Sequence, residues 1–88
     1  MFNISNNGDS MRLNDAQKNT QYKITAIHDD SELLAKFNKF GFFPGSLITL
    51  KRKAPLFGDP LLVEVENSQY ALTKREAAFV EILKVESE

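Results

Sequence analysis

The sequence predicts a mainly β protein: a small, partly open barrel of about five short strands, with one inserted amphipathic helix and a one-turn helix before the last strand. Two observations predict this fold. Short segments with alternating apolar and polar residues recur between turn signals, and one segment, 31–40, has apolar residues at helical spacing instead. Short strands with one apolar side close readily into a barrel, because closure removes unpaired edges.

A chain of 88 residues allows one domain with a thin core. Residues 1–10, rich in Asn, Ser and Gly, are expected to form a mobile tail. The domain is predicted to span 11–85, and the acidic segment 86–88 to be a frayed end.

The first elements follow this tail. Asn14 or Asp15 is placed to cap a brief turn, and Asn19 tolerates the positive φ that a further turn requires. The segment 22–28 then alternates as a strand does, with one apolar side formed by Tyr22, Ile24 and Ala26.

The helix is predicted over 31–40. Asp29, Asp30 or Ser31 offers an N-cap, and Asp29 with Glu32 has the spacing of a capping box. The apolar stripe of this helix consists of Leu33, Leu34, Phe37 and Phe40.

The end of the helix and the next turn are marked by glycine and proline. Gly41 is the natural residue after the helix, because glycine readily adopts positive φ. Pro44 and Gly45 predict a type II turn. A strand is expected over 47–54, with its inward side formed by Ile48 and Leu50.

The second half of the chain contains a hairpin and a closing strand. A constrained loop, 55–60, precedes strands over 61–66 and 69–73, which are joined by a turn at Asn67-Ser68. The inward candidates of this hairpin are Leu61, Val63, Val65, Tyr70 and Leu72.

Thr73 and Glu76 have the spacing of a capping box, which predicts one helical turn through Ala78. The segment 79–85 is expected to close the sheet with Val80 and Ile82 inward. This order of elements is typical of a barrel of SH3-like type.

Composition excludes several classes of function. The absence of cysteine excludes disulfides, thiolate nucleophiles and Cys-ligated metal sites, and favours the cytoplasm for so small a domain. No apolar run approaches the ~20 residues that span a bilayer, so direct membrane insertion is not expected. A net charge of −1 disfavours binding to nucleic acid. No glycine-rich phosphate loop or nucleophile–base pair is found, so we expect no enzyme and no cofactor.

Two motifs in order resemble the FeoA family. They are Gly-Phe-Phe-Pro-Gly at 41–45 and Ala-Pro-Leu-Phe-Gly-Asp-Pro at 54–60, and the likeness extends over about residues 11–85. The residues of these motifs that are judged structural are Gly41, Pro44, Gly45, Pro55, Gly58, Asp59 and Pro60, and the capping-box residues Thr73 and Glu76 are judged structural as well.

The resemblance implies an SH3-like barrel in the cytoplasm. Such a barrel would bind the cytoplasmic region of FeoB, the membrane protein that carries a G-protein domain and moves Fe(II) inward, and FeoB would recruit it to the inner membrane. FeoA-like domains are also similar to the C-terminal barrel of some iron-dependent repressors. A nucleic-acid-binding or regulatory module is therefore the alternative, although no helix-turn-helix precedes the barrel. Weak self-association stays open.

Candidate partner contacts are apolar residues in loops or on the helix. For Phe42, Phe43, Leu56 and Phe57 as a set, packing over the ends of the barrel is the simpler interpretation. The alternative is that one or two of them, with Phe57 and Phe43 preferred, stay exposed as anchors for a protein partner. On the helix, Leu33 and Leu34 are adjacent and cannot point the same way, so Leu33 is added as a candidate.

Two polar features are judged structural. The run Lys51, Arg52 and Lys53 alternates faces in a strand and can meet Glu64 and Glu66 across the sheet. His28 is the only histidine, and one imidazole beside two aspartates is weak ground for a metal site.

Overall fold

The computed structural model describes residues 10–28, 31–55 and 57–85. Six antiparallel strands form one sheet in the order β1-β6-β2-β3-β4-β5. The elements are β1 (Met11–Arg12), the 3-10 helix η2 (Leu13–Asp15), β2 (Gln21–Ile27), α1 (Ser31–Phe40), β3 (Leu47–Lys53), β4 (Leu61–Val65), β5 (Ser68–Leu72), α2 (Lys74–Ala77) and β6 (Val80–Lys84).

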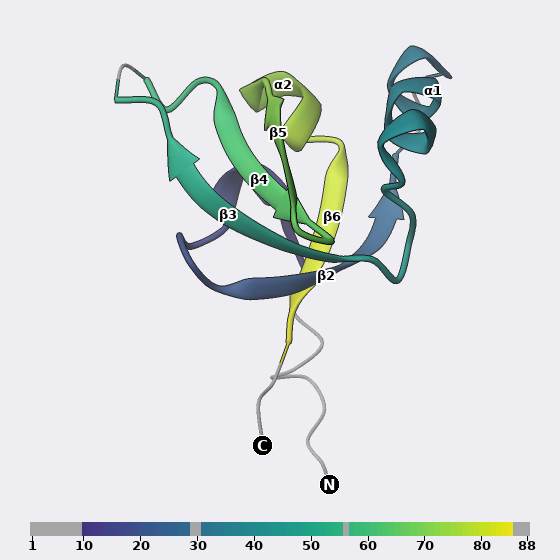
Figure 1. Cartoon of the computed structure of the whole chain (residues 1–88), viewed down its shortest axis with the longest axis horizontal. Coiled ribbons are helices and arrows are strands. Elements are labelled where there is room, and N and C mark those ends of the chain that lie inside the picture. Colours follow the sequence, from purple (N-terminus) through teal and green to yellow (C-terminus); the bar gives the residue numbers. More distant parts are fainter. Residues whose placement is uncertain (1–9, 29–30, 56, 86–88) are drawn as a thin grey trace, which may run out of the picture.

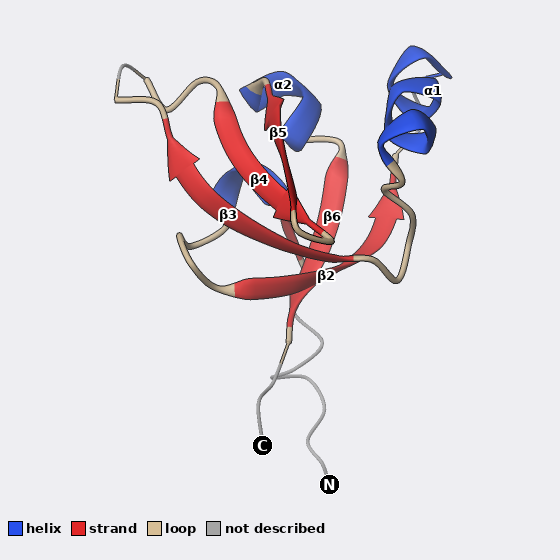
Figure 2. Cartoon of the chain, viewed as in Figure 1, coloured by secondary structure: helices blue, strands red, loops and turns tan. Residues whose placement is uncertain are grey.

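The sheet curls around a common core, with α2 at its upper end and α1 to one side in this view (Figures 1 and 2). The mainly β fold with one longer helix and a one-turn helix confirms the prediction. The additional strand, β1, pairs Met11 with Ile82 and Arg12 with Glu81. Two residues are too few to produce an alternating pattern, so this strand could not be predicted from the sequence.

The core takes apolar side chains from β2 through β6, from η2 and from both α-helices. The inward positions predicted for β3 and β6 are confirmed, because Ile48, Leu50, Val80 and Ile82 are all completely buried. Among the described residues, no buried residue is polar or charged. Apart from the Tyr22 hydroxyl, which accepts the Gln17 N–H at 2.9 Å, the core is apolar, and its stability comes mainly from packed hydrocarbon area.

The C-terminal end of α1 has the hydrogen bonds of a Schellman motif. The Gly41 N–H donates to Asn38 O at 3.2 Å, and the Phe42 N–H donates to Phe37 O at 2.9 Å. Gly41 has φ of 83°, as predicted for the residue after a helix. The chain thereby folds back, and the rings of Phe37 and Phe42 lie 5.0 Å apart.

Two predicted turns have the expected backbone, and one turn was placed wrongly. Gly45 has φ of 100° in a type II turn closed by the Ser46 N–H on Phe43 O, and Asn19 has φ of 63°. The hairpin turn consists of Glu66 and Asn67 rather than Asn67 and Ser68, with φ of 53° and 70°. Glutamate rarely takes positive φ, so its presence in a turn of type I′ could not be anticipated.

The predicted caps have different outcomes. Asn14 and Asp15 lie within η2 rather than capping it, because Arg12 occupies the N-cap and makes no side-chain cap. The α1 cap proposed at Asp29 or Asp30 lies outside the described residues. The capping box of α2 is confirmed: the Glu76 N–H donates to Thr73 Oγ1 at 3.0 Å, and Glu76 Oε1 accepts the Thr73 N–H at 2.9 Å.

Glu76 also joins the two helices. Its Oε2 lies 2.7 Å from the Lys36 Nζ of α1. Partial burial opposes ionisation of this carboxylate, but the bonds from Lys36 and Thr73 outweigh it and hold the pKa of Glu76 below its usual value of 4.5. Because the folded-state pKa is lowered, the carboxylate stabilises the fold above the usual pKa and loses this contribution as pH falls through the lowered one.

Replacing Gly41 with alanine tests the helix end. A Cβ at this position would meet no atom within 4 Å, so the cost is only that of positive φ in a residue with a side chain. We expect Gly41→Ala to lower the free energy of unfolding by about 1–2 kcal/mol. Gly41→Asn is the matched control and should cost less, since asparagine tolerates this conformation. Urea denaturation measures both, and equal losses would contradict the assignment.

Replacing Glu76 with glutamine tests the link between the helices. Glutamine retains the capping hydrogen bond but not the charge, so Glu76→Gln should cost about 0.5–1 kcal/mol at neutral pH. The difference in the free energy of unfolding between the variant and the parent protein should shrink as pH falls below 4.5. In a Lys36→Met background the same substitution should have little effect at neutral pH. A difference independent of pH and of Lys36 would refute this role.

Candidate docking site

The loop 55–60 projects beyond the strands it joins, β3 and β4, and carries the most exposed large apolar side chain among the described residues. Phe57 is 80% exposed. It also has φ of 63°, a conformation that bulky residues rarely adopt. The ring is therefore presented to solvent by a backbone that itself costs free energy.

Hydrogen bonds hold the base of this loop. The Ala54 N–H donates to Pro60 O at 3.0 Å. The Lys74 N–H, at the start of α2, donates to Asp59 Oδ1 at 2.9 Å, and Lys74 Nζ donates to Phe57 O at 3.3 Å. The loop is therefore fixed to α2 on both sides of Gly58, which accounts for Asp59 in the motif.

The neighbouring residues Phe42 and Phe43 have opposite environments. Phe42 is completely buried, whereas Phe43 is 48% exposed in the turn before β3. Because β3 separates this turn from the loop 55–60, Phe43 and Phe57 lie at opposite ends of that strand (Figure 1). The structure thus does not bring the two preferred candidates together.

Leu33 offers little surface to a partner, and its role as a partner contact stays a prediction. Leu33 is only 5% exposed and belongs to the core, while the adjacent Leu34 is half-buried. Helical spacing placed both on the apolar stripe and could not tell which one faces the barrel. The remaining candidate, Leu56, lies outside the described residues.

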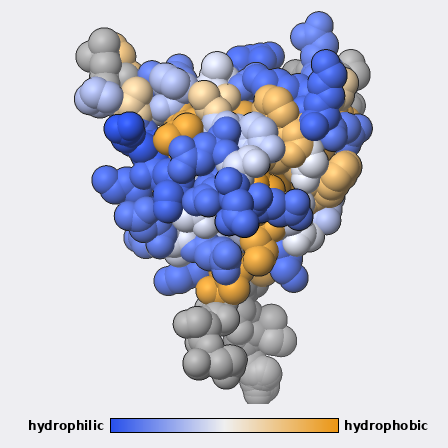
Figure 3. Space-filling view, in the orientation of Figure 1, coloured by the Kyte–Doolittle hydropathy of each residue, from blue (hydrophilic) through white to orange (hydrophobic). Residues whose placement is uncertain are grey.

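A mostly apolar hollow of about 320 Å³ lies beside the loop. Its floor is a row across three strands, in which Arg52 pairs with Leu62 and Leu62 pairs with Ala71. Pro55 and Pro60 form part of its wall. The sequence pointed to the prolines but not to Leu62 and Ala71, although both occupy outward positions of their strands. The space-filling view shows apolar residues between the hydrophilic ones that cover most of the viewed face (Figure 3).

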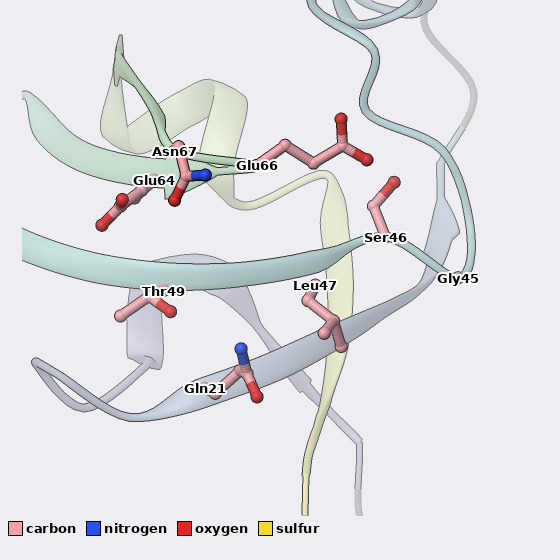
Figure 4. A pocket seen from close by; sticks show the side chains of 8 residues that line it. All are labelled: Gln21, Gly45, Ser46, Leu47, Thr49, Glu64, Glu66 and Asn67. Atoms are coloured by element: carbon pink, nitrogen blue, oxygen red, sulfur yellow. The ribbon is translucent and has the colours of Figure 1, made fainter.

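A second hollow, of about 440 Å³, contains none of the predicted partner contacts. It lies over the outer side of β3, where Leu47 and Thr49 stand between Gln21 of β2 and Glu64 of β4 (Figure 4). The Glu64 carboxylate lies 3.6 Å from Lys51 Nζ, as predicted across the sheet, whereas Glu66 is in the hairpin turn. The Lys51 and Glu64 side chains are partly exposed to solvent, and their opposite charges compensate each other.

His28 has a carboxylate partner. Its Nε2 lies 2.8 Å from Glu81 Oε1. Hydrogen bonds, the larger effect from Ser10 and the smaller from His28, lower the pKa of Glu81.

Within the ranges that the structure describes, no three histidine, aspartate or glutamate side chains gather as metal ligands would. In the same ranges, each helix is too short or too polar to cross a membrane.

Comparisons with known proteins identify the family. The FeoA domain matches residues 11–84. No curated protein sequence matches the chain. The solution structure of iron(II) transport protein A from Clostridium thermocellum is 32% identical with a TM-score of 0.80, covering 85% of this chain and 46% of that one. This chain therefore spans about half the length of that protein.

Two further structures show how the fold is used elsewhere. FeoA of Stenotrophomonas maltophilia, an SH3 domain protein complexed with zinc, is 27% identical with a TM-score of 0.71, covering 82% of this chain and 88% of that one. A manganese-dependent transcriptional repressor is 14% identical with a TM-score of 0.79, covering 86% of this chain and 42% of that one, and it shares the fold alone.

The family match covers nearly all of the described barrel, and it includes the glycine that ends α1, the type II turn and the loop fixed to α2. The chain is therefore a member of the FeoA family of ferrous iron transport, with an SH3-like barrel.

Proposed function

We propose that this protein is a non-catalytic accessory protein of bacterial ferrous iron uptake, which binds the cytoplasmic region of FeoB and modulates Fe(II) transport. The observation that carries the proposal is Phe57, because it combines an exposed ring with positive φ. Both features are energetically unfavourable in the protein without a partner. The exposed ring contributes little burial of apolar area, and the positive φ costs about 1–2 kcal/mol. Such unfavourable features are typical of functional sites.

The surroundings of Phe57 fit a protein partner. The loop is fixed at Asp59 and at the carbonyl of Phe57 itself, so the ring is positioned before any partner arrives. Pre-positioning reduces the entropy lost on binding. The apolar hollow next to the loop can accept a side chain in return. An aromatic anchor beside a small pocket is a common arrangement at protein interfaces.

A related structure supports a role that modulates iron transport. The Stenotrophomonas maltophilia relative is described as a proposed activating factor of bacterial ferrous iron transport. We transfer that role here as modulation of FeoB: contacts that differ between two conformations of the transporter shift their populations. The protein would act in the cytoplasm, at the inner face of the membrane that holds FeoB.

The test is the affinity of the purified FeoB cytoplasmic region for variants at position 57. Phe57→Asn removes the ring and suits positive φ, so binding should weaken about tenfold or more while the free energy of unfolding stays equal or rises. Phe57→Tyr keeps most of the ring and should bind as the parent does. Iron uptake in cells carrying each variant should follow the affinities.

Three results would count against the proposal. A large loss of stability in Phe57→Asn would assign the ring to packing rather than to a partner. Undiminished binding of Phe57→Asn in every nucleotide state of FeoB would move the contact to another surface. Absence of any binding by the parent protein, together with normal iron uptake after deletion, would exclude the function itself.

A further inference from the structure

The sheet has two edges, and they differ in how well they are protected. β1 has only two residues, whereas β5 has five and pairs with β4 in an unbroken register. Edge strands are usually protected by shortness, charged side chains, proline or a bulge. The sequence of β5, Ser-Gln-Tyr-Ala-Leu, has none of these features. β5 is therefore an edge on which another strand can pair.

The hairpin register shows which backbone groups of β5 are open. Val65 and Ser68 flank a two-residue turn and form a hydrogen-bonded pair. Because such pairs alternate along an antiparallel ladder, Tyr70 and Leu72 also bond to β4, whereas Gln69 and Ala71 direct their N–H and C=O groups away from it.

Gln69 and Ala71 remain open in the folded chain. Within the part of the chain that the structure describes, no hydrogen bond uses the backbone groups of either residue. Both residues are also exposed to solvent. Two donors and two acceptors therefore lie in a row along the edge, spaced as a second strand requires.

Charge along β5 indicates what the second strand is. An acidic side chain, Glu66, lies in the turn at its start, beside Glu64, which is already paired with Lys51. A basic side chain, Lys74, begins α2 at its end, where the carboxylates of Asp59 and Glu76 already have partners within the chain. An antiparallel copy of the same strand places the acidic end of each against the basic end of the other. The edge is thus complementary to itself.

We propose that β5 pairs antiparallel with β5 of a second copy of this chain, as an isologous dimer across a twofold axis at Tyr70. Gln69 then lies opposite Ala71 of the second copy, and the reverse, so all four open groups of each chain are used. The same register brings Glu66 toward Lys74 of the second copy. Such a short edge buries little area, so the dimer is weak and depends on concentration.

Hydrogen exchange of individual amides, measured by NMR, tests this pairing. From about 10 µM to about 1 mM protein, the range in which a small interface associates, the Gln69 and Ala71 amides should become slower to exchange. The Tyr70 and Leu72 amides, bonded to β4, should be protected throughout and serve as internal controls. Sedimentation over the same range should show the mass approaching that of a dimer.

Two sets of variants locate the contact. Ala71→Pro removes one outward N–H without touching the ladder to β4, since proline is tolerated at an outward position of an edge strand, and should abolish association. Ala71→Val keeps the N–H and should still associate. Lys74→Glu should weaken association about fivefold or more, and the double change Glu66→Lys with Lys74→Glu should restore it.

Each outcome of these experiments either supports or overturns the pairing of β5 with a second copy. Exchange at Gln69 and Ala71 that does not change with concentration overturns the proposal, and so does association that persists in Ala71→Pro. If Ala71→Pro does not fold, failure of the charge reversal to restore association overturns it instead. Protection of the two amides only after addition of the FeoB cytoplasmic region would assign the edge to the transporter and exclude self-pairing, while leaving the role of Phe57 intact.

Discussion

Four aromatic rings join α1 to the barrel, and much of the structure depends on that junction. Phe37 and Phe40 come from the helix, Phe42 is the second residue after its end, and Tyr70 comes from β5. Phe40 stacks on Tyr70 with ring centroids 4.6 Å apart, and Phe42 meets Tyr70 edge-on at 5.1 Å. Aromatic rings bury large areas, which a domain of this size needs. The backbone reversal at Gly41 that brings Phe42 inward also leaves Phe43 outside.

Much of this fold follows from local patterns. Alternation located five of the strands, helical spacing located α1, and Gly41, Gly45 and the Thr73–Glu76 box were assigned from residue type alone. These features succeed because each is determined by residues adjacent in the chain. β1 and the turn at Glu66 were missed because a two-residue strand has no period and glutamate is an unusual turn residue.

The candidate site was less accessible to sequence reasoning. Two adjacent phenylalanines, Phe42 and Phe43, are alike in sequence and opposite in burial, since tertiary packing alone separates them. The same holds for Leu33 and Leu34. Exposure of Phe57 was only the alternative interpretation, and its positive φ was not anticipated, because nothing in the residue itself favours that conformation. Likeness to a metal-dependent repressor carries no functional weight at 14% identity.

The four residues of α2 connect two distant parts of the molecule. Asp59 accepts the Lys74 N–H at its start, the Thr73–Glu76 box closes its first turn, and Glu76 continues to Lys36 on α1. Polar contacts thus run from Asp59, at the base of the 55–60 loop, through α2 to Lys36 on the long helix. A shift of the loop at Asp59 would therefore strain the first turn of α2 and, through Glu76, its contact with α1.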